Sequence, residues 1–168
     1  MFQKLYPTRY YSSTYAIDFQ KYYDMGYRGI LFDIDNTLVP HGAPADSRAV
    51  ALFDRLKNIG FKTCLVSNNK EPRVASFSSM TKTAYVFKAG KPLKKGYIRA
   101  MDTIGTNTDN TLFVGDQLFT DLWGANSLHM TTLLVQPIDK KEEIQIVLKR
   151  IPERFILFCY RHSRYNKK

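Results

Sequence analysis

Residues 30–40 read ILFDIDNTLVP. Apolar residues run directly into two aspartates, Asp33 and Asp35, that are separated by one isoleucine. The run at residues 28–34 is typical of a buried parallel strand. Carboxylates are rarely buried unless they are paired or bind a metal. The stretch therefore predicts a strand that delivers two acidic groups to a functional site.

Strand-like and helix-like segments alternate around this stretch. Residues 46–60 have apolar side chains at helical spacing, with Asp46 as the N-cap and Gly60 at the C-terminal end. Further strands are expected at 61–67, 84–87, 111–115 and 131–135, and further helices at 72–80, 94–104 and 122–127. From Lys140 onward the pattern is helical, with an expected interruption at Pro152. This alternation predicts an α/β fold with a parallel sheet covered on both faces.

The length and charge of the chain limit the possibilities further. A chain of 168 residues suits one domain with a sizeable core. We expect that domain to span residues 1–168, with an aromatic-rich leader at 1–27 and a basic, aromatic tail at 152–168. The formal net charge of +10 favours anionic partners, meaning nucleic acid, acidic lipid or phosphorylated substrates.

Cysteine usage and hydropathy indicate the compartment. Cys64 lies in an apolar run, which predicts a buried thiol and favours a reducing environment. Residues 1–14 lack the continuous apolar segment of a secretory signal, and no apolar run approaches the ~20 residues of a membrane span. We therefore expect a cytoplasmic protein, and peripheral contact with the inner membrane surface stays open.

Polar side chains follow the expected strands at the points where the strands end. They are Asp33 and Asp35, Ser67 and Asn68, Lys91, and Asp116 with Asp121 shortly after. In open parallel sheets ligand sites form beyond the carboxyl ends of the strands, so these groups should converge at one edge. Carboxylates, a hydroxyl and a lysine suit a metal ion and a phosphate. The sequence therefore predicts a site for both.

Two other interpretations of Asp33 and Asp35 are weaker. A calcium loop of the EF-hand type requires glycine at the position that Leu38 occupies, and the flanking segment is a strand. A simple turn is the second alternative, because aspartate and asparagine favour turns. The matching polar groups at the other strand ends favour a functional site over a turn.

Four segments carry a resemblance to a known family. DIDNTL, VSNN, GKP and GDQLFTD, in this order on an alternating α/β chain, resemble the four motifs of the haloacid-dehalogenase-like (HAD) phosphatases. The order, the spacing and the leader LYPTRYY are most similar to the YqeG-type phosphatases of HAD subfamily IIIA. The resemblance implies a three-layer α/β/α Rossmannoid fold. It also implies a phosphoric monoester hydrolase that requires Mg²⁺.

The resemblance assigns the reacting groups to motif I. Asp33 matches the nucleophile, whose carboxylate attacks phosphorus and forms an aspartyl-phosphate. Asp35 matches the residue that protonates the leaving alkoxide and then deprotonates the attacking water. In the family, Asp33 and the backbone carbonyl of Asp35 also bind magnesium. The presence of Asp35 matches the phosphatase branch rather than the dehalogenase branch.

The other motifs supply binding groups. Ser67 resembles the residue whose hydroxyl holds a phosphoryl oxygen, with Asn68 beside it as a second substrate-binding candidate. Lys91 resembles the lysine that offsets the charge of the nucleophile and the phosphate. Asp116 matches the direct magnesium ligand of motif IV, and Asp121 matches its supporting acidic partner. Two acidic groups approach a phosphate dianion only when cations cancel the repulsion.

The motif spacing leaves no room for a cap domain, because only a helix and a strand fit between successive motifs. An open site suits a bulky substrate such as a lipid head group, a nucleic-acid end or a protein. The resemblance extends to phosphatidylglycerophosphate phosphatases, so this membrane phospholipid is the leading expected substrate. Two alternatives stay open: a phosphatase of soluble or nucleic-acid phosphates, and an RNA- or ribosome-associated binding module with incidental phosphatase activity.

Aromatic and basic residues occur together in the tail. They are Phe155, Ile156, Leu157, Phe158 and Tyr160, with Arg154, Arg161, Arg164, Lys167 and Lys168. This composition suits an anionic bilayer surface or single-stranded nucleic acid. Equally, the apolar residues could complete the domain core.

Three further residues carry local expectations. His41 is best interpreted as a loop residue just past motif I, and Trp123 as a residue of the core. His129 lies in the turn before the last strand, where the family usually has glycine. A histidine there predicts a strained backbone.

Overall fold

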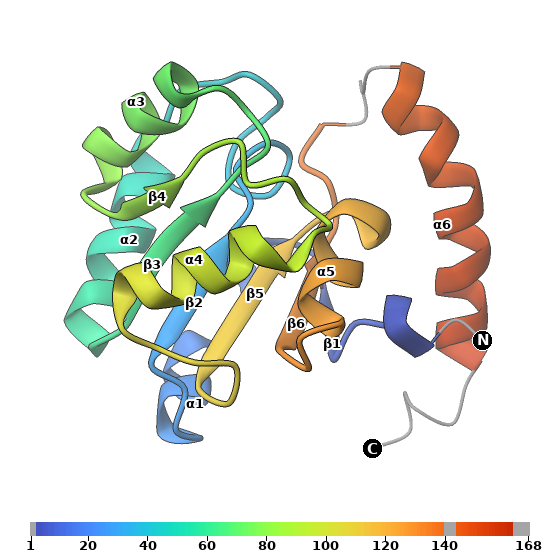
Figure 1. The fold of residues 1–168 in the computed structure, drawn as a ribbon, viewed down its shortest axis with the longest axis horizontal. Helices are drawn as coiled ribbons and strands as arrows, with labels where there is room; N and C mark the ends of the chain where they lie inside the picture. The colour runs from blue at the N-terminus through green and yellow to red at the C-terminus, as the bar shows by residue number, and fades with distance from the viewer. Residues whose placement is uncertain (1–2, 140–143, 163–168) are drawn as a thin grey trace.

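The computed structural model describes residues 3–139 and 144–162 of the chain. A parallel sheet of six strands lies at its centre, in the order β1-β6-β5-β2-β3-β4 (Figure 1). The strands are β1 (Arg9–Tyr11), β2 (Gly29–Phe32), β3 (Lys62–Val66), β4 (Ala84–Val86), β5 (Thr111–Gly115) and β6 (Thr131–Val135). Every neighbouring pair of strands is parallel, which confirms the predicted sheet.

Helices cover both faces of the sheet. One face packs against α1 (Phe19–Asp24), α2 (Ser47–Ile59) and α3 (Glu71–Thr81), and the other against α4 (Lys94–Ile104) and α5 (Trp123–Asn126). Short helical turns are η1 (Gln3–Leu5), η2 (Thr14–Ala16) and η3 (Leu118–Leu122).

The side chains of β2 divide between the two layers, as expected of a fully buried strand. Ile30 and Phe32 join the cluster of the first three helices, whereas Leu31 joins the cluster of α4 and α5. The predicted three-layer α/β/α fold is confirmed. No additional cap domain stands between the motifs within the described residues.

Local signals set the ends of α2 as the sequence predicts. The Asp46 side chain accepts a hydrogen bond from the Ala49 backbone N–H at 2.7 Å. Gly60 follows the helix with a φ of 112°, a left-handed conformation that glycine adopts without strain. Cys64 of the next strand is buried, also as predicted.

The leader contributes an edge strand that the sequence analysis did not anticipate. Strand β1 pairs with β6, with Arg9 opposite Leu133 and Tyr11 opposite Val135. A strand of three residues is too short to show the alternating pattern by which strands are recognised. Part of the expected leader is therefore built into the sheet.

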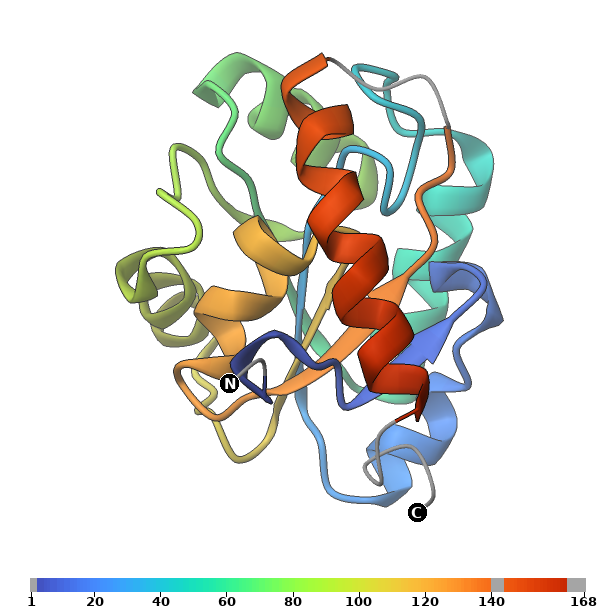
Figure 2. The same cartoon turned by 90° about the vertical axis from the view of Figure 1, so that its right-hand side faces the viewer.

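The last helix, α6 (Ile144–His162), runs across the side of the molecule beside β1 and β6 (Figure 2). It continues through Pro152, so the expected interruption is wrong. Proline removes one backbone donor, which weakens a helix. Tertiary packing offsets that loss, because Ile156 and Leu157 pack against β6 and η3.

The tail completes the core with only some of its apolar residues, and its binding to a bilayer or to nucleic acid stays a prediction. Ile156 and Tyr160 are buried, whereas Phe155 and Phe158 are each 60% exposed. Arg164, Lys167 and Lys168 lie outside the described residues. No helix in the described ranges has both the length and the hydropathy to cross a membrane.

Two local expectations near η3 have opposite outcomes. Trp123 is 47% exposed, so its assignment to the core is wrong. The buried side of α5 is formed by Gly124 and Ala125, and a Cβ on Gly124 would lie 2.5 Å from a backbone oxygen. This close approach leaves no space for a large ring. The strained backbone at His129 is confirmed by its φ of 61°.

Candidate active site

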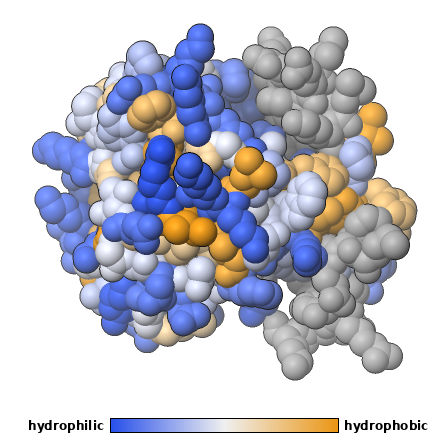
Figure 3. All heavy atoms as spheres, viewed as in Figure 1, coloured by the Kyte–Doolittle hydropathy of each residue, from blue (hydrophilic) through white to orange (hydrophobic). Residues whose placement is uncertain are grey.

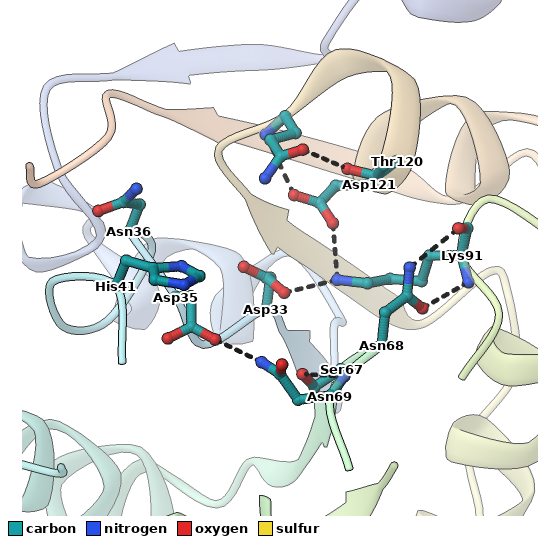
Figure 4. Close-up of a pocket in the computed structure, with 11 residues that line it drawn as sticks. Asp33, Asp35, Asn36, His41, Ser67, Asn68, Asn69, Lys91, Thr120 and Asp121 are labelled. Carbon is teal, nitrogen blue, oxygen red and sulfur yellow. Dashed lines mark hydrogen bonds and ion pairs between the residues drawn. The ribbon is translucent and has the colours of Figure 1, made fainter. Parts of the chain in front are cut away.

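Loops beyond the carboxyl ends of the strands enclose a pocket of about 180 Å³ (Figure 4). The sequence-predicted residues that line it are Asp33, Asp35, Ser67, Asn68, Lys91 and Asp121. Asp116 borders an adjacent cavity of about 410 Å³ instead. The structure thus brings the predicted residues to one edge of the sheet, while their individual roles stay predictions.

Asp33 directly follows β2 and is fixed by the sheet. Its backbone N–H donates to the Val114 carbonyl of β5 at 3.0 Å. The Thr37 hydroxyl lies 3.3 Å from Asp33 Oδ2 and 3.2 Å from Asp116 Oδ1. Thr37 therefore links motif I to motif IV. This link was not predicted, although Thr37 belongs to the stretch that contains both aspartates.

The amino group of Lys91 lies between Asp33 and Asp121 (Figure 4). Its Nζ is 2.5 Å from Asp33 Oδ1 and 2.7 Å from Asp121 Oδ1. The lysine side chain is only 3% exposed, so both ion pairs are shielded from water. A buried lysine requires such partners, because an isolated buried charge is strongly unfavourable.

The pKa values of Asp33 and Lys91 are shifted because two buried carboxylates, those of Asp33 and Asp121, share one lysine. Burial raises the pKa of Asp33 to about 7; the Lys91 charge opposes this shift and the Asp121 charge adds to it. Burial alone would lower the pKa of Lys91, but the charges of Asp121 and Asp33 raise it above its ordinary value. Lys91 therefore stays charged at neutral pH, and Asp33 is incompletely compensated by it.

The three carboxylates form a compact cluster. Asp33, Asp116 and Asp121 each place one ligand atom within 4.8 Å of the others, and all three residues are buried. Lys91 neutralises part of their charge. Oxygen ligands at this spacing suit a divalent cation, which would offset the remaining negative charge.

Motif IV owes its geometry to a glycine and a tyrosine. A Cβ on Gly115 would lie 2.7 Å from Asp121 Oδ2, so this position has no space for a side chain. The Gln117 N–H donates to the same oxygen at 3.1 Å. The Tyr97 hydroxyl of α4 lies 2.9 Å from the carbonyl oxygens of both Thr120 and Asp121. Tyr97 was not predicted, because only the fold brings it to η3.

Motif II follows β3. The Ser67 hydroxyl accepts a hydrogen bond from the Asn69 N–H at 3.2 Å. The Asn68 side chain accepts from the Lys91 N–H at 2.7 Å and donates to the Lys91 carbonyl at 3.0 Å. Asn68 therefore fixes the lysine loop in place, and its predicted contact with substrate stays a prediction.

Asp35 is held by three donors from three segments. Its Oδ1 accepts from the Gly42 N–H at 2.8 Å and from Arg73 Nη2 at 3.0 Å. Its Oδ2 accepts from Asn69 Nδ2 at 2.6 Å. Arg73 was not predicted. His41, interpreted as a loop residue, also lines the pocket.

The arrangement has the chemical groups of a group-transfer site. A buried carboxylate at Asp33 is available as a nucleophile, and Asp35 is available as an acid or a base. Lys91 and the acidic cluster around it can balance the charge of an incoming anion.

The comparisons with known proteins agree with this geometry. A family model described as haloacid dehalogenase-like hydrolase matches residues 42–129. The chain is 34% identical over 152 residues to "Probable phosphatase YqeG" of Bacillus subtilis, covering 90% of this chain and 88% of that protein. The chain belongs to the haloacid dehalogenase-like hydrolases. The family predicted from the four motifs is therefore confirmed.

Solved structures share the fold of this hydrolase. A HAD phosphatase from Thermococcus onnurineus aligns with a TM-score of 0.50 at 17% identity, over 60% of this chain and 50% of that one. The chain thus spans half the length of that protein. The cobalt-bound deoxy-D-mannose-octulosonate 8-phosphate phosphatase of Haemophilus influenzae aligns with a TM-score of 0.51 at 11% identity, over 66% and 68% of the chains. At these identities the likeness concerns the fold alone.

Proposed function

We propose that this hydrolase is a magnesium-dependent phosphomonoesterase that acts through an aspartyl-phosphate at Asp33. The observation that carries the proposal is the position of Lys91 Nζ, 2.5 Å from Asp33 and 2.7 Å from Asp121, within a buried acidic cluster. A purely structural ion pair would not require two carboxylates on one lysine and a third carboxylate beside them. A site that must bind a dianion and a cation together does require them.

Each residue of the pocket has a distinct part in the proposed reaction. The Asp33 carboxylate attacks phosphorus in line with the leaving oxygen, which splits hydrolysis into two easier steps. Asp35 donates a proton to that oxygen and then takes one from the water that releases phosphate. Lys91 balances the charge of the nucleophile and the phosphoryl group, and Ser67 hydrogen-bonds a phosphoryl oxygen.

The acidic residues fit a magnesium ion. Asp33, Asp116 and the backbone carbonyl of Asp35 would bind it, with Asp121 as a supporting carboxylate. Magnesium favours a few carboxylates together with waters and substrate phosphate. When bound, it supplies positive charge next to the phosphoryl oxygens. The raised pKa of Asp33 supports this fit, because a buried carboxylate that is incompletely compensated by Lys91 gains from a second cation.

Among phosphomonoesters, we propose phosphatidylglycerophosphate as the leading substrate. The pocket has no cap domain over it within the described residues, which suits a substrate that stays in a membrane. The outer side of α6 also exposes Ile151, Phe155 and Phe158, with Arg154 and Arg161 on the same helix. Apolar side chains next to arginines suit an anionic bilayer surface.

The surface supports this choice of substrate. In Figure 3, hydrophilic side chains cover much of the face over α4, and hydrophobic side chains also reach the surface on the α6 side. The net charge of +10 further favours an anionic partner.

Phosphate release distinguishes the proposals. The wild type and Asp33→Asn would be assayed on phosphatidylglycerophosphate in mixed micelles, on a soluble alkyl phosphate and on an aryl phosphate, each with magnesium or EDTA. We expect magnesium-dependent release by the wild type with a preference for the lipid, and none by a folded Asp33→Asn. Hydrolysis of the soluble esters alone would remove the lipid assignment but keep the mechanism. Tight, salt-sensitive RNA binding without turnover would favour the binding module instead.

A further inference from the structure

Three donors of the protein restrain the carboxyl group of Asp35 at the edge of the pocket. Both of its oxygens accept hydrogen bonds: Oδ1 from the Gly42 N–H and from Arg73, and Oδ2 from Asn69. The three donors come from the loop after motif I, from motif II and from α3. In Figure 4 the Asp35 side chain points toward Asn69 at the edge of the pocket, with Asp33 beside it.

Arg73 occupies a position that the helix dipole does not favour. It is the third residue of α3, in the first turn, where the helix dipole disfavours a cation. Its guanidinium lies 5.7 Å from the centre of the Phe77 ring, one turn further along the helix. Its Nε is buried without a hydrogen-bond partner among the described residues. Residues that break a local rule are expected where function requires them.

Arg73 does not reach the pocket itself. The lining residues include Asp35 and Asn69 but not Arg73, and the arginine side chain is 21% exposed. We therefore expect its effect on the reaction to pass through Asp35, the pocket residue that it contacts. The contact is a charge-assisted hydrogen bond, which is stronger and more directional than a neutral one.

We propose that Arg73 is a positioning residue that, with Asn69, fixes the carboxyl group of Asp35 for proton transfer. This inference rests on the proposed function. Without the guanidinium, Asp35 loses its one charge-assisted contact, and the Gly42 and Asn69 hydrogen bonds alone hold the carboxyl group less firmly. A displacement of about 1 Å can cost about 100-fold in rate.

The role predicts dependence on the leaving group. An alkoxide requires a proton as it departs, whereas a nitrophenolate is stable enough to depart without one. General acid catalysis contributes about 100- to 10,000-fold where it is needed. A residue that acts through Asp35 should therefore matter for alkyl phosphates and matter little for nitrophenyl phosphate.

The experiment compares Arg73→Met with a matched control. Methionine keeps an unbranched stem against Phe77 but has no donor. The control is Arg48→Met, because Arg48 is also in the first turn of a helix and lies 4.0 Å from the centre of an aromatic ring, Tyr15, outside the pocket. We expect Arg73→Met to lose about 100-fold in kcat on an alkyl phosphate and less than about 5-fold on nitrophenyl phosphate. Arg48→Met should lose neither.

A double-mutant cycle tests whether the effect passes through Asp35. In an Asp35→Asn background, Arg73→Met should produce little further loss on the alkyl phosphate. Equal losses on both esters, or a full additional loss in that background, would overturn the positioning role while the phosphatase assignment stands. A wild type that hydrolyses neither ester would overturn the proposed function and this inference together.

Discussion

Asp33 is subject to two opposing requirements. A nucleophile must be ionised, but burial raises the pKa of Asp33 to about 7. Lys91 opposes that shift, and the nearby charge of Asp121 adds to it. A bound cation, as in the proposed magnesium site, would offset the cost of ionising Asp33. Conflicts of this kind between stability and activity are common at catalytic sites.

The pKa of Asp33 predicts a stability difference that depends on pH. The folded-state pKa is raised above the ordinary value of 3.8, so the stability contributed by Asp33 is lost as pH rises through about 7. In EDTA, the free energy of unfolding of Asp33→Asn relative to that of the wild type should therefore rise by on the order of 2 kcal/mol from pH 5 to pH 8. Urea unfolding at both pH values measures this. If the free energies of unfolding of the wild type and the variant differed by the same amount at pH 5 and at pH 8, this would contradict the assigned pKa.

The acidic residues of the site were predictable because Asp33 and Asp116 directly follow strands and Asp121 lies shortly after β5. Asp33, Asp116 and Asp121 belong to segments whose position relative to the sheet is readable from the order of the chain. Arg73 and Tyr97 were not predictable, because each lies within a helix and meets the site only across an interface between elements. Nothing in their local sequence distinguishes them from ordinary surface or core residues.

At the scale of elements, the unpredicted features are those that tertiary packing decides. Strand β1 is too short to show a pattern, and α6 continues through Pro152 because its buried side packs on the body of the protein. The turn η3 is π-helical. This conformation is rare in proteins overall, and where it occurs it is often part of a functional site. The sequence of residues 118–122 has no pattern that predicts it. Its close contact with α4 gives it a definite position.

The contact between α4 and η3 predicts a role in metal binding. Tyr97→Phe removes the hydroxyl that lies 2.9 Å from the Thr120 and Asp121 carbonyls. We expect the magnesium concentration for half-maximal activity to rise about 10-fold, because groups that orient metal ligands tune affinity by such factors. The stability loss should be about 1 kcal/mol.

The matched control is Tyr85→Phe, whose hydroxyl contacts an exposed glutamate at 3.3 Å, away from motif IV. It should leave the magnesium dependence unchanged. A Tyr97→Phe protein with the wild-type magnesium requirement would show that η3 keeps its geometry without α4.

For the whole molecule, the alternation of strands and helices was enough to predict the architecture, and the four motifs were enough to predict the family. The proposed substrate rests on features that the alternation does not specify. These are the surface of α6, the charge around the pocket and the space above it. The proposed covalent bond between the Asp33 carboxylate and phosphorus would form with any phosphomonoester substrate.

The most direct test is to trap that bond. The wild type would be quenched during turnover of nitrophenyl phosphate with magnesium, reduced with borohydride and analysed by peptide mass spectrometry. An acyl phosphate at Asp33 is reduced to homoserine, so we expect homoserine at position 33 in the wild type. It should be absent without substrate, and Asp33→Asn should show neither turnover nor homoserine. Steady turnover with an unmodified Asp33, or with the label on another carboxylate, would contradict the account.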